Sequence, residues 1–337
     1  MLPAMRLLVL GGTSFVGRAL VENGVARGWD VTTFNRGRGA WSHPDATRAI
    51  GDRLDPGTLV PLGMRDWDVV ADTWSGAARA ARDAAAVLAP RTRHYAYISS
   101  CSVYAPPPPM GVDESAPTVD ATPDDEHVAD YAVRKRGSEM AIEQAFGDRA
   151  LLVRPALVLG PHEDVGRLPW WLLRLARGGE VLAPGPADQP LQLIDARDLA
   201  AWTLDAAAAG RHGAYNAVSR RGHATMRSLL AAAVTATGGD ATLTWVAPEV
   251  IAEQGIEPWS ELPIWLPPDH EFRALHAVGV DKIHAAGLVT RPAQDTVADT
   301  WAWLSALGEA PPQRADIPPH GLDAPRERAA LAAARAA

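Results

Sequence analysis

Tyr131 and Lys135 are the first residues of this sequence whose types and spacing point to chemistry. Four residues apart on a helix, the two side chains share one face. A nearby ammonium favours the tyrosinate, so it lowers the pKa of the phenol toward neutrality. The chain contains only one other lysine, Lys282, which favours a task for Lys135 that arginine cannot perform. We expect Tyr131 to exchange a proton with a substrate carbinol or ketone.

A serine cluster precedes this pair in the run 98–104, ISSCSVY. It follows a predicted strand, and open α/β sheets bind ligands at the carboxyl ends of their strands. We expect the hydroxyl of Ser100 to hold the substrate oxygen in line with Tyr131. Capping of a turn is the alternative use of such a serine.

A glycine-rich turn lies near the start of the chain, between a predicted strand and a predicted helix. Small residues allow the backbone to approach a pyrophosphate, and the helix N-terminus offers free N–H groups. The sequence therefore predicts a dinucleotide site here. The residues expected to contact the cofactor are Gly11, Thr13, Ser14, Phe15, Val16 and Gly17.

The end of the next strand predicts which dinucleotide binds. It reads Asn35-Arg36-Gly37-Arg38, with no carboxylate for a free ribose 2′-hydroxyl and two arginines suited to a 2′-phosphate. We expect NADP in preference to NAD, although solvated loop arginines remain the alternative. Asp52 is placed to accept from the adenine amino group, and Thr73 ends a further strand at the same edge.

Alternating strand and helix patterns in the first half must position these groups. Strands are predicted at 6–10, 30–34, 67–73, 94–99 and 151–155, and helices at 16–27, 76–89 and 131–146. This alternation predicts an α/β fold, a Rossmann-type doubly wound parallel sheet with a smaller C-terminal substrate-binding domain. The second half is richer in Pro, Gly and Trp, with helices expected at 198–209, 225–237 and 295–307 and a loop at 178–190.

We expect a dinucleotide-binding domain of residues 1–160 plus about 190–222. The substrate-binding domain would contain about 161–189 plus 223–310, followed by a tail at 311–337. The helices predicted at 76–89 and 131–146 are rich in alanine, whose small side chain allows close packing.

Composition excludes several classes of partner. The 337 residues carry a net charge of −8, which argues against nucleic-acid binding and a polybasic membrane anchor. No apolar run is long enough for a membrane span, and we expect no signal peptide at the start. The single cysteine, Cys101, excludes an intrachain disulfide and favours a reducing cytoplasm.

Together the glycine turn, the Ser-Ser-x-x-Val-Tyr run, Tyr-x-x-x-Lys and Arg154-Pro155 resemble extended short-chain dehydrogenases/reductases, most of all the NAD-dependent epimerase/dehydratase group, over residues 5–310. The GGTSFVG turn is also similar to the atypical branch containing the chloroplast stem-loop-binding proteins. The resemblance implies that Ser100 is the catalytic serine, Tyr131 the acid/base and Lys135 the ribose-binding lysine. Pro155 would belong to the segment flanking the nicotinamide amide. The resemblance also implies that the helices at 76–89 and 131–146 form the interface of a homodimer.

The sequence departs from subgroups of this family. Cys101-Ser102 follows Ser100 where sugar dehydratases carry an Asp-Glu pair, and Leu191 stands where nucleotide-sugar epimerases carry an arginine. Ser14 replaces the middle glycine of the turn, and its hydroxyl suits a 2′-phosphate. These departures argue against dehydration and against a nucleotide-sugar substrate.

Several residues of the second half and of the strand ends are weaker candidates for contact with substrate. His162-Glu163-Asp164 lacks a spaced partner histidine, so no metal site is expected. Tryptophans are more often core than ligand wall, which weighs against each aromatic candidate. The candidates are Trp74, Tyr104, His162, Trp170 and Asp195.

The sequence predicts an NAD(P)-dependent oxidoreductase that transfers a hydride between nicotinamide and a carbinol or ketone of a small or natural-product substrate. An epimerase that retains its cofactor and acts on a sugar-like substrate is one alternative. A non-catalytic cofactor-sensing or RNA-binding module on the same fold is another.

Overall fold

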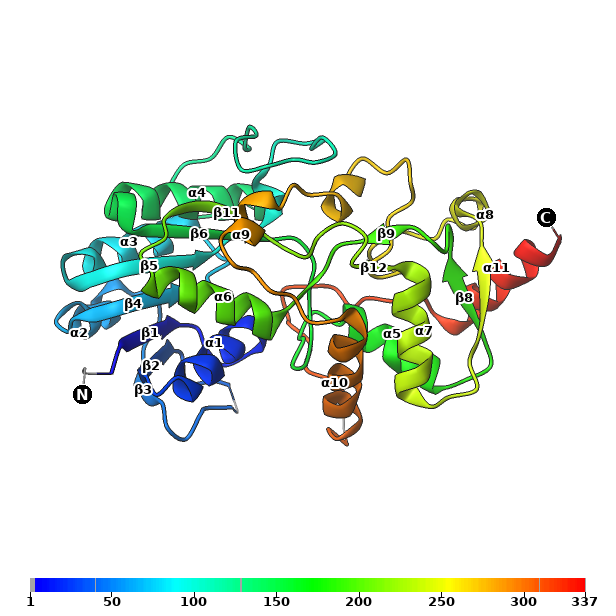
Figure 1. Cartoon of the computed structure of the whole chain (residues 1–337), viewed down its shortest axis with the longest axis horizontal. Helices are drawn as coiled ribbons and strands as arrows, with labels where there is room; N and C mark the ends of the chain where they lie inside the picture. The colour runs from blue at the N-terminus through cyan, green and yellow to red at the C-terminus, as the bar shows by residue number, and fades with distance from the viewer. Residues whose placement is uncertain (1–3, 40, 128, 309, 337) are drawn as a thin grey trace. The chain divides into compact units, whose positions relative to one another are not determined.

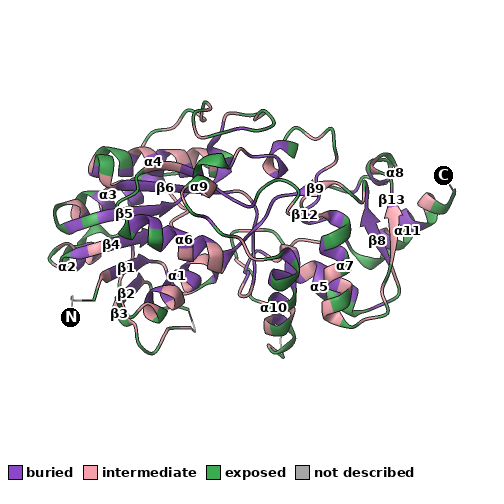
Figure 2. Cartoon of the chain, viewed as in Figure 1, coloured by how far each residue is buried: buried purple, intermediate pink, exposed green. Residues whose placement is uncertain are grey.

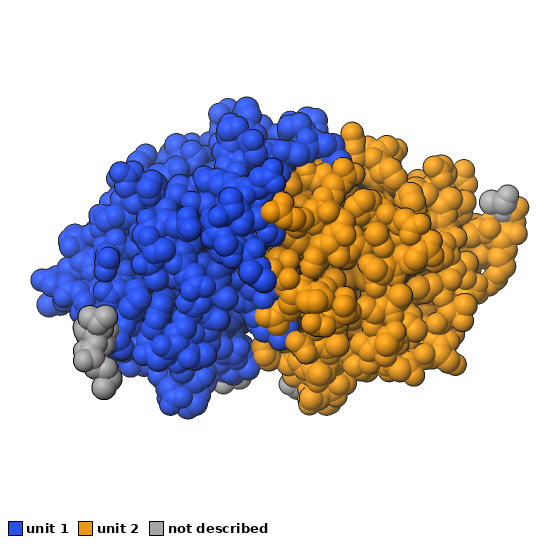
Figure 3. Space-filling view, in the orientation of Figure 1, with its two compact units in different colours: residues 1–156, 196–218, 279–289 blue, residues 157–195, 219–278, 290–337 orange. Residues whose placement is uncertain are grey.

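The computed structural model describes residues 4–39, 41–127, 129–308 and 310–336. They form two compact units (Figure 3). Unit 1 spans residues 1–156, 196–218 and 279–289, and unit 2 spans residues 157–195, 219–278 and 290–337. Residues 279–289, predicted in the substrate-binding domain, belong to unit 1. Residues 157–160, 190–195 and 219–222, predicted in the dinucleotide-binding domain, belong to unit 2, as does the tail.

Unit 1 is built on a seven-stranded sheet in the order β11-β6-β5-β4-β1-β2-β3 (Figure 1). Every neighbouring pair in this sheet is parallel. The predicted Rossmann-type sheet is thus confirmed, with its change of winding direction between β1 and β4. Its strands are β1 (Arg6–Leu10), β2 (Asp30–Asn35), β3 (Thr47–Ile50), β4 (Trp67–Asp72), β5 (Thr92–Ile98), β6 (Ala150–Pro155) and β11 (Gly213–Ala217).

Helices cover both faces of this sheet (Figure 1). Helices α3 and α4 pack against each other, and so do α1 and α6. The central strands are the most buried elements (Figure 2), and Leu7, Leu8 and Val9 of β1 have no exposed surface. Burial on both faces explains why these strands read as continuous apolar runs. The helices of unit 1 are α1 (Phe15–Ala26), α2 (Val60–Gly63), α3 (Ala78–Leu88), α4 (Tyr131–Phe146), α6 (Ala196–Ala208) and α9 (Asp281–Ala285).

The segment 279–289 belongs to unit 1 because α9 packs on the edge strand β11. The Nζ atom of Lys282 donates to the carbonyl of Ala214 at 2.7 Å and lies 4.3 Å from the ring centroid of Tyr215. Lys282 therefore fastens the sheet edge.

Most alanines of α3 face the interior of unit 1. Ala78, Ala81, Ala84 and Ala85 are all fully buried. A Cβ atom on Gly137 of α4 would lie 2.8 Å from the Cβ of Ala78. Small residues at this contact therefore let α3 and α4 approach closely. The homodimer expected from these two helices stays a prediction.

Unit 2 has its own hydrophobic core, which includes Trp171 and Trp265. Its strands form three two-stranded pairs, β10 with β7, β12 with β9 and β13 with β8. The loop expected at 178–190 is wrong in part, because β8 occupies most of its first half. The elements of unit 2 are β7 (Val158–Leu159), α5 (Arg167–Ala176), β8 (Glu180–Pro184), β9 (Pro190–Leu191), β10 (Ile194–Asp195), β12 (Ala224–Thr225), α7 (Met226–Thr237), β13 (Thr242–Val246), α8 (Pro248–Glu253), α10 (Ala293–Ser305) and α11 (Ala324–Ala336).

The predicted separate tail is also wrong, because its helix α11 is part of the unit 2 core. Leu331 of α11 is buried there. The buried carboxylate of Glu327 accepts from Nε of Arg174 on α5 at 2.7 Å. Of the helices in the described residues, none is long and apolar enough to cross a membrane.

Candidate active site

The glycine turn joins β1 to α1 at the carboxyl edge of the sheet. Gly11 has φ +113°, and a Cβ atom there would lie 2.4 Å from Oγ1 of Thr73. A Cβ atom on Gly17 would lie 2.7 Å from the backbone nitrogen of Gly12. Ser14 precedes α1 in an extended conformation and makes no side-chain cap hydrogen bond. The turn is thus a tight cradle beside the N-terminus of a twelve-residue helix.

A cavity of ≈ 240 Å³ adjoins this turn. It brings together residues that the sequence predicted from four separate strand ends, namely Gly11, Thr13, Asn35, Arg36, Arg38, Asp52 and Thr73. Sequence reasoning missed the other lining residues, which are Leu10, Phe34, Gly39, Gly51, Arg53, Leu54 and Ser75. The remaining predicted cofactor residues lie in or beside the first turn of α1 and at the end of β6, outside this lining. They are Ser14, Phe15, Val16, Gly17 and Pro155.

The predicted phosphate-reading arginines lie at the mouth of the cavity. Asn35 ends β2, and its Oδ1 accepts from the backbone N–H of Gly37 at 2.9 Å. That bond shapes the turn carrying Arg36 and Arg38, both exposed. Asp52 also lines the cavity, and its Oδ1 accepts from the N–H of Leu54 at 3.0 Å. The cavity lining therefore includes two exposed guanidinium groups.

A buried ion pair supports the wall of the cavity. Nη2 of Arg53 donates to Oδ2 of Asp72 at 2.6 Å, and the hydroxyl of Tyr95 donates to the same oxygen at 2.6 Å. Burial alone would raise the pKa of Asp72, but the charge and hydrogen bonds of Arg53 outweigh it, so the pKa is lowered. Arg53 also lies over the indole of Trp74, 5.0 Å from its ring centroid. The pair ties the loop after β3 to the end of β4.

Helix α4 presents the predicted tyrosine and lysine. It begins at Tyr131, where Oδ1 of Asp130 accepts from the N–H of Val133 at 3.0 Å. Tyr131 is 42% exposed and Lys135 only 3%. The Nζ atom of Lys135 lies 5.9 Å from the ring centroid of Tyr131. One helical turn therefore places a partly exposed phenol beside a buried ammonium.

The same ammonium joins two strand ends. Nζ of Lys135 donates to the carbonyl of Ile98, the last residue of β5, at 2.7 Å. It also donates to the carbonyl of Trp74, a cavity residue after β4, at 2.5 Å. Lys135 thus lies between the serine cluster and the dinucleotide cavity.

Ser100 stands two residues beyond Ile98 and precedes a short 3-10 turn, Cys101–Val103. Its Oγ accepts from the N–H of Ser102 at 3.1 Å and donates to Oγ of Ser102 at 3.0 Å. Ser100 therefore caps this turn, the structural role weighed beside the catalytic one. Capping fixes the hydroxyl at the strand end.

Of the weaker substrate candidates in unit 1, only Trp74 lines the cavity. Its Nε1 donates to the carbonyl of Ala77 at 2.8 Å. Tyr104 does not line this cavity: its side chain is buried, and its hydroxyl donates to Oδ1 of Asn216 at 2.6 Å. Burial raises the pKa of this phenol.

The other three candidates lie in unit 2. The ring of His162 packs 5.1 Å from that of Trp303, and Trp170 packs 4.7 Å from Trp171. Asp195 is buried and accepts from Oγ1 of Thr296 at 2.9 Å. Among the residues that the structure describes, no three His, Cys, Asp or Glu side chains gather as metal ligands.

Solved structures share this fold. The UDP-glucose 4-epimerase of Thermotoga maritima with UDP-glucose is 16% identical, with 90% of this chain and 100% of that chain covered and a TM-score of 0.66. The Bordetella bronchiseptica enzyme WbmH in complex with NAD+ is 19% identical, with the same coverage and TM-score. The UDP-N-acetylglucosamine 4-epimerase of Methanobrevibacter ruminantium M1 in complex with UDP-N-acetylmuramic acid is 15% identical, with 90% and 99% covered and a TM-score of 0.68.

No curated protein matches the chain by sequence. A family model does match, over residues 7–217, and this segment contains the glycine turn, the serine cluster and the Tyr131/Lys135 pair. The resemblance read from those motifs is therefore confirmed: the chain belongs to the NAD dependent epimerase/dehydratase family of enzymes.

Proposed function

We propose that this protein is an NADP-dependent oxidoreductase that interconverts a carbinol and a ketone on a small or natural-product substrate. The observation that carries the proposal is the position of Lys135. Its Nζ joins the strand end before Ser100 to Trp74 of the cavity, and it lies beneath the ring of Tyr131. A proton-transfer site beside a dinucleotide cavity is what carbonyl reduction requires.

The chain's residues fit the cofactor. The cradle at Gly11 and Gly12 would hold the pyrophosphate, and the cavity lining would hold the adenosine. Lys135 would bind the ribose next to the nicotinamide. A bound nicotinamide dinucleotide supplies or accepts the hydride.

The proposed chemistry of the protein is a proton transfer at the phenol. Oγ of Ser100 hydrogen-bonds the substrate oxygen. Oη of Tyr131 gives its proton to that oxygen during reduction and takes it back during oxidation. The positive charge of Lys135 favours the phenolate and so makes this exchange accessible near neutral pH.

The preference for NADP follows from the mouth of the cavity. Arg36 and Arg38 supply charge there, and β2 ends in Asn35 rather than in a carboxylate. A carboxylate at that position would bind the 2′-hydroxyl of NAD and repel a 2′-phosphate. The positive charge of the two arginines therefore favours NADP over NAD.

An epimerase that oxidises and then reduces one carbon is the second candidate, favoured by the family to which the chain belongs. Such an enzyme retains its cofactor through turnover. Leu191 stands in place of the arginine expected of nucleotide-sugar epimerases, which weighs against a nucleotide sugar as the substrate of such an epimerase.

Titration of the purified protein with NADP+ and NAD+, followed by assay of NADPH oxidation against a panel of ketones and aldehydes, tests the proposal. We expect tighter binding of NADP+ and a loss of absorbance at about 340 nm, the NADPH band, with at least one carbonyl class. Binding of neither dinucleotide would overturn it. Conversion of a substrate without any net absorbance change would favour the epimerase.

We further propose a cytoplasmic location and a homodimer. The single cysteine, Cys101, is a buried free thiol, which suits a reducing compartment. Sedimentation at micromolar concentration tests the dimer, and a monomeric mass would contradict it.

A further inference from the structure

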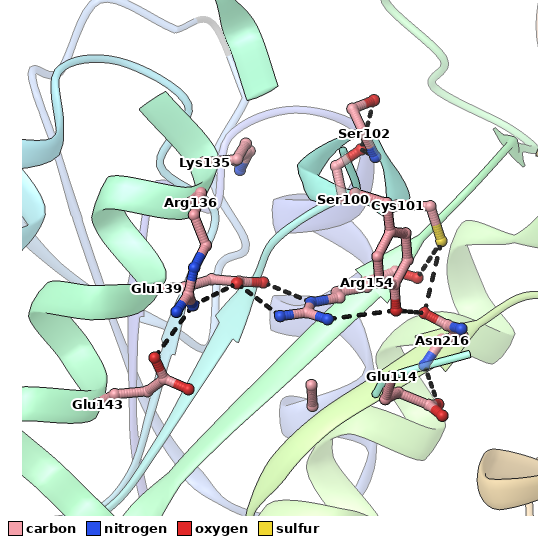
Figure 4. A network of polar contacts seen from close by, with 12 residues as sticks. Ser100, Cys101, Ser102, Glu114, Lys135, Arg136, Glu139, Glu143, Arg154 and Asn216 are labelled. Atoms are coloured by element: carbon pink, nitrogen blue, oxygen red, sulfur yellow. Dashed lines mark hydrogen bonds and ion pairs between the residues drawn. The ribbon is translucent and has the colours of Figure 1, made fainter. Parts of the chain in front are cut away.

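A buried ion pair links the helix of the proposed acid/base to the sheet. Glu139 of α4 is 0% exposed and Arg154 of β6 is 4% exposed. Nε and Nη2 of the arginine donate to the two carboxylate oxygens, each at 2.8 Å (Figure 4). This fork allows one alignment of the two groups, which a contact between apolar side chains would not impose.

Glu139, the acidic partner, lies on the helix that carries the proposed proton-transfer groups. Glu139 lies one helical turn beyond Lys135, which itself lies one turn beyond Tyr131. Nη1 of Arg136 adds a further bond to Oε2 of Glu139 at 3.0 Å. Rotation or sliding of α4 would separate these partners, so the carboxylate fixes the helix against β6.

Arg154, the basic partner, contacts both sides of the turn that follows Ser100. Sγ of Cys101, the next residue, donates to the carbonyl of Arg154 at 3.1 Å. Nη1 of Arg154 donates to the hydroxyl of Tyr104 at 3.2 Å, at the far side of the same turn. Figure 4 shows these groups converging on one arginine.

Asn216 of β11 anchors this end of the network. Its Oδ1 accepts from Tyr104, and its Nδ2 donates to the carbonyls of Val112 at 3.2 Å and Gly279 at 3.0 Å. The turn that Arg154 contacts is therefore also hydrogen-bonded to the neighbouring strand β11.

We propose that the Glu139–Arg154 pair is a positioning element, which holds Lys135 and Ser100 in register with a bound dinucleotide. A buried ion pair adds little to stability compared with apolar packing, so the specific alignment is its main contribution. The inference rests on the proposed function, because it assumes that Lys135 contacts the cofactor ribose.

Calorimetric titration of the Glu139→Gln variant with NADP+ and with adenosine 2′,5′-bisphosphate tests the proposal. The bisphosphate occupies only the adenosine half of the site and does not reach Lys135. We expect NADP+ to bind roughly tenfold more weakly, the loss that follows when one hydrogen bond to a charged group is weakened. The bisphosphate should bind as it does to the wild type. Unchanged NADP+ affinity, or equal weakening of both ligands, would overturn the proposal.

Glu327→Gln is the matched control, since it breaks the buried Arg174–Glu327 pair of unit 2. It should lower Tm as Glu139→Gln does while leaving the affinity for NADP+ unchanged. Glu143→Gln, on the exposed side of α4, should change neither quantity.

If Glu139→Gln fails to fold, Arg154→Lys replaces it, since it keeps the charge and loses the fork. The same contrast between NADP+ and the bisphosphate is expected of that variant. Failure of the wild-type protein to bind either ligand would reject the proposed function. If the wild type binds both ligands and the variant binds them equally well, only the positioning role is rejected.

Discussion

The ammonium of Lys135 donates a hydrogen bond of 2.5 Å to the main-chain carbonyl of Trp74. The indole of Trp74 lines the dinucleotide cavity, and Tyr97 donates to the same carbonyl at 2.9 Å. The proposed catalytic lysine thus holds the loop that forms one wall of the cofactor site. The proposed catalytic and cofactor-binding residues therefore share one hydrogen-bonded framework.

Removal of the two arginines at the cavity mouth should change cofactor preference. Arg36→Ala combined with Arg38→Ala is expected to weaken NADP+ binding by at least about tenfold, because each arginine offers a charge-assisted hydrogen bond to the 2′-phosphate. Affinity for NAD+ should stay the same. Parallel calorimetric titrations measure both affinities, with Arg48→Ala as a control that removes a positive charge from the exposed strand β3, outside the cavity lining. Equal loss for the two dinucleotides would contradict the assignment.

Gly11→Ala is expected to abolish dinucleotide binding. Gly11 has φ +113°, and the added methyl group would lie 2.4 Å from Oγ1 of Thr73 inside the cradle. Gly28→Ala is its control, since Gly28 also has a positive φ but no atom within 4 Å of an added Cβ. Both variants should lose about 1 kcal/mol of stability through backbone strain, measured by urea unfolding. Wild-type affinity for NADP+ in Gly11→Ala would show that the cradle is not used.

Asp72→Asn should destabilise unit 1 by about 3 kcal/mol, because it leaves the buried guanidinium of Arg53 without its counter-charge. Replacement of both partners, with Asp72→Leu and Arg53→Met, should recover most of that loss. Asp66→Asn, in an exposed ion pair, should cost less than about 1 kcal/mol. Denaturant unfolding provides the comparison, and a double variant as unstable as Asp72→Asn would contradict this account.

Glu163 is expected to make the stability of unit 2 depend on pH. Burial raises the pKa of this carboxyl from 4.5 to about 7, although Arg167 opposes the shift. The folded state therefore holds the proton more tightly than the unfolded state. The stabilisation is complete below pH 4.5, the ordinary value of the group, and is lost as the pH rises through about 7.

Glu163→Gln should remove a decline of about 3 kcal/mol over that window, the free energy equivalent of the shift. Tm measured at half-unit steps of pH gives the slope for each variant. Glu249→Gln, an exposed glutamate in the first turn of α8, is the control and should keep the wild-type slope. A slope that survives in Glu163→Gln would place its origin in another group.

Most of the Rossmann-type half was predictable because its central strands are buried on both faces. β1, β4 and β6 read as apolar runs for that reason. The edge strand β3 was missed because three of its four residues are exposed. In unit 2, β8 escaped prediction because glycines and prolines flank a strand with only one partner, β13.

The candidate site was predictable where chemistry depends on local spacing. Tyr131 and Lys135 share a helix, so their relation is visible in the sequence. The cavity contacts of Arg53 depend on the order of strands in the sheet, in which β1 and β2 lie between β3 and β4. Spacing in the sequence does not reveal that order. The position of Glu139 one helical turn after Lys135 is visible in the sequence. Its pairing with Arg154 is not, because Arg154 lies on the separate strand β6.

The kinetics of Tyr131→Phe test the central claim most directly. The variant removes only the hydroxyl of a half-exposed side chain, so the fold and the affinity for NADP+ should match the wild type. Turnover of NADPH with a carbonyl substrate should fall by at least about a hundredfold, the usual contribution of general acid catalysis. Retained turnover in a variant that binds the dinucleotide normally would contradict the assignment of Tyr131 as the proton donor.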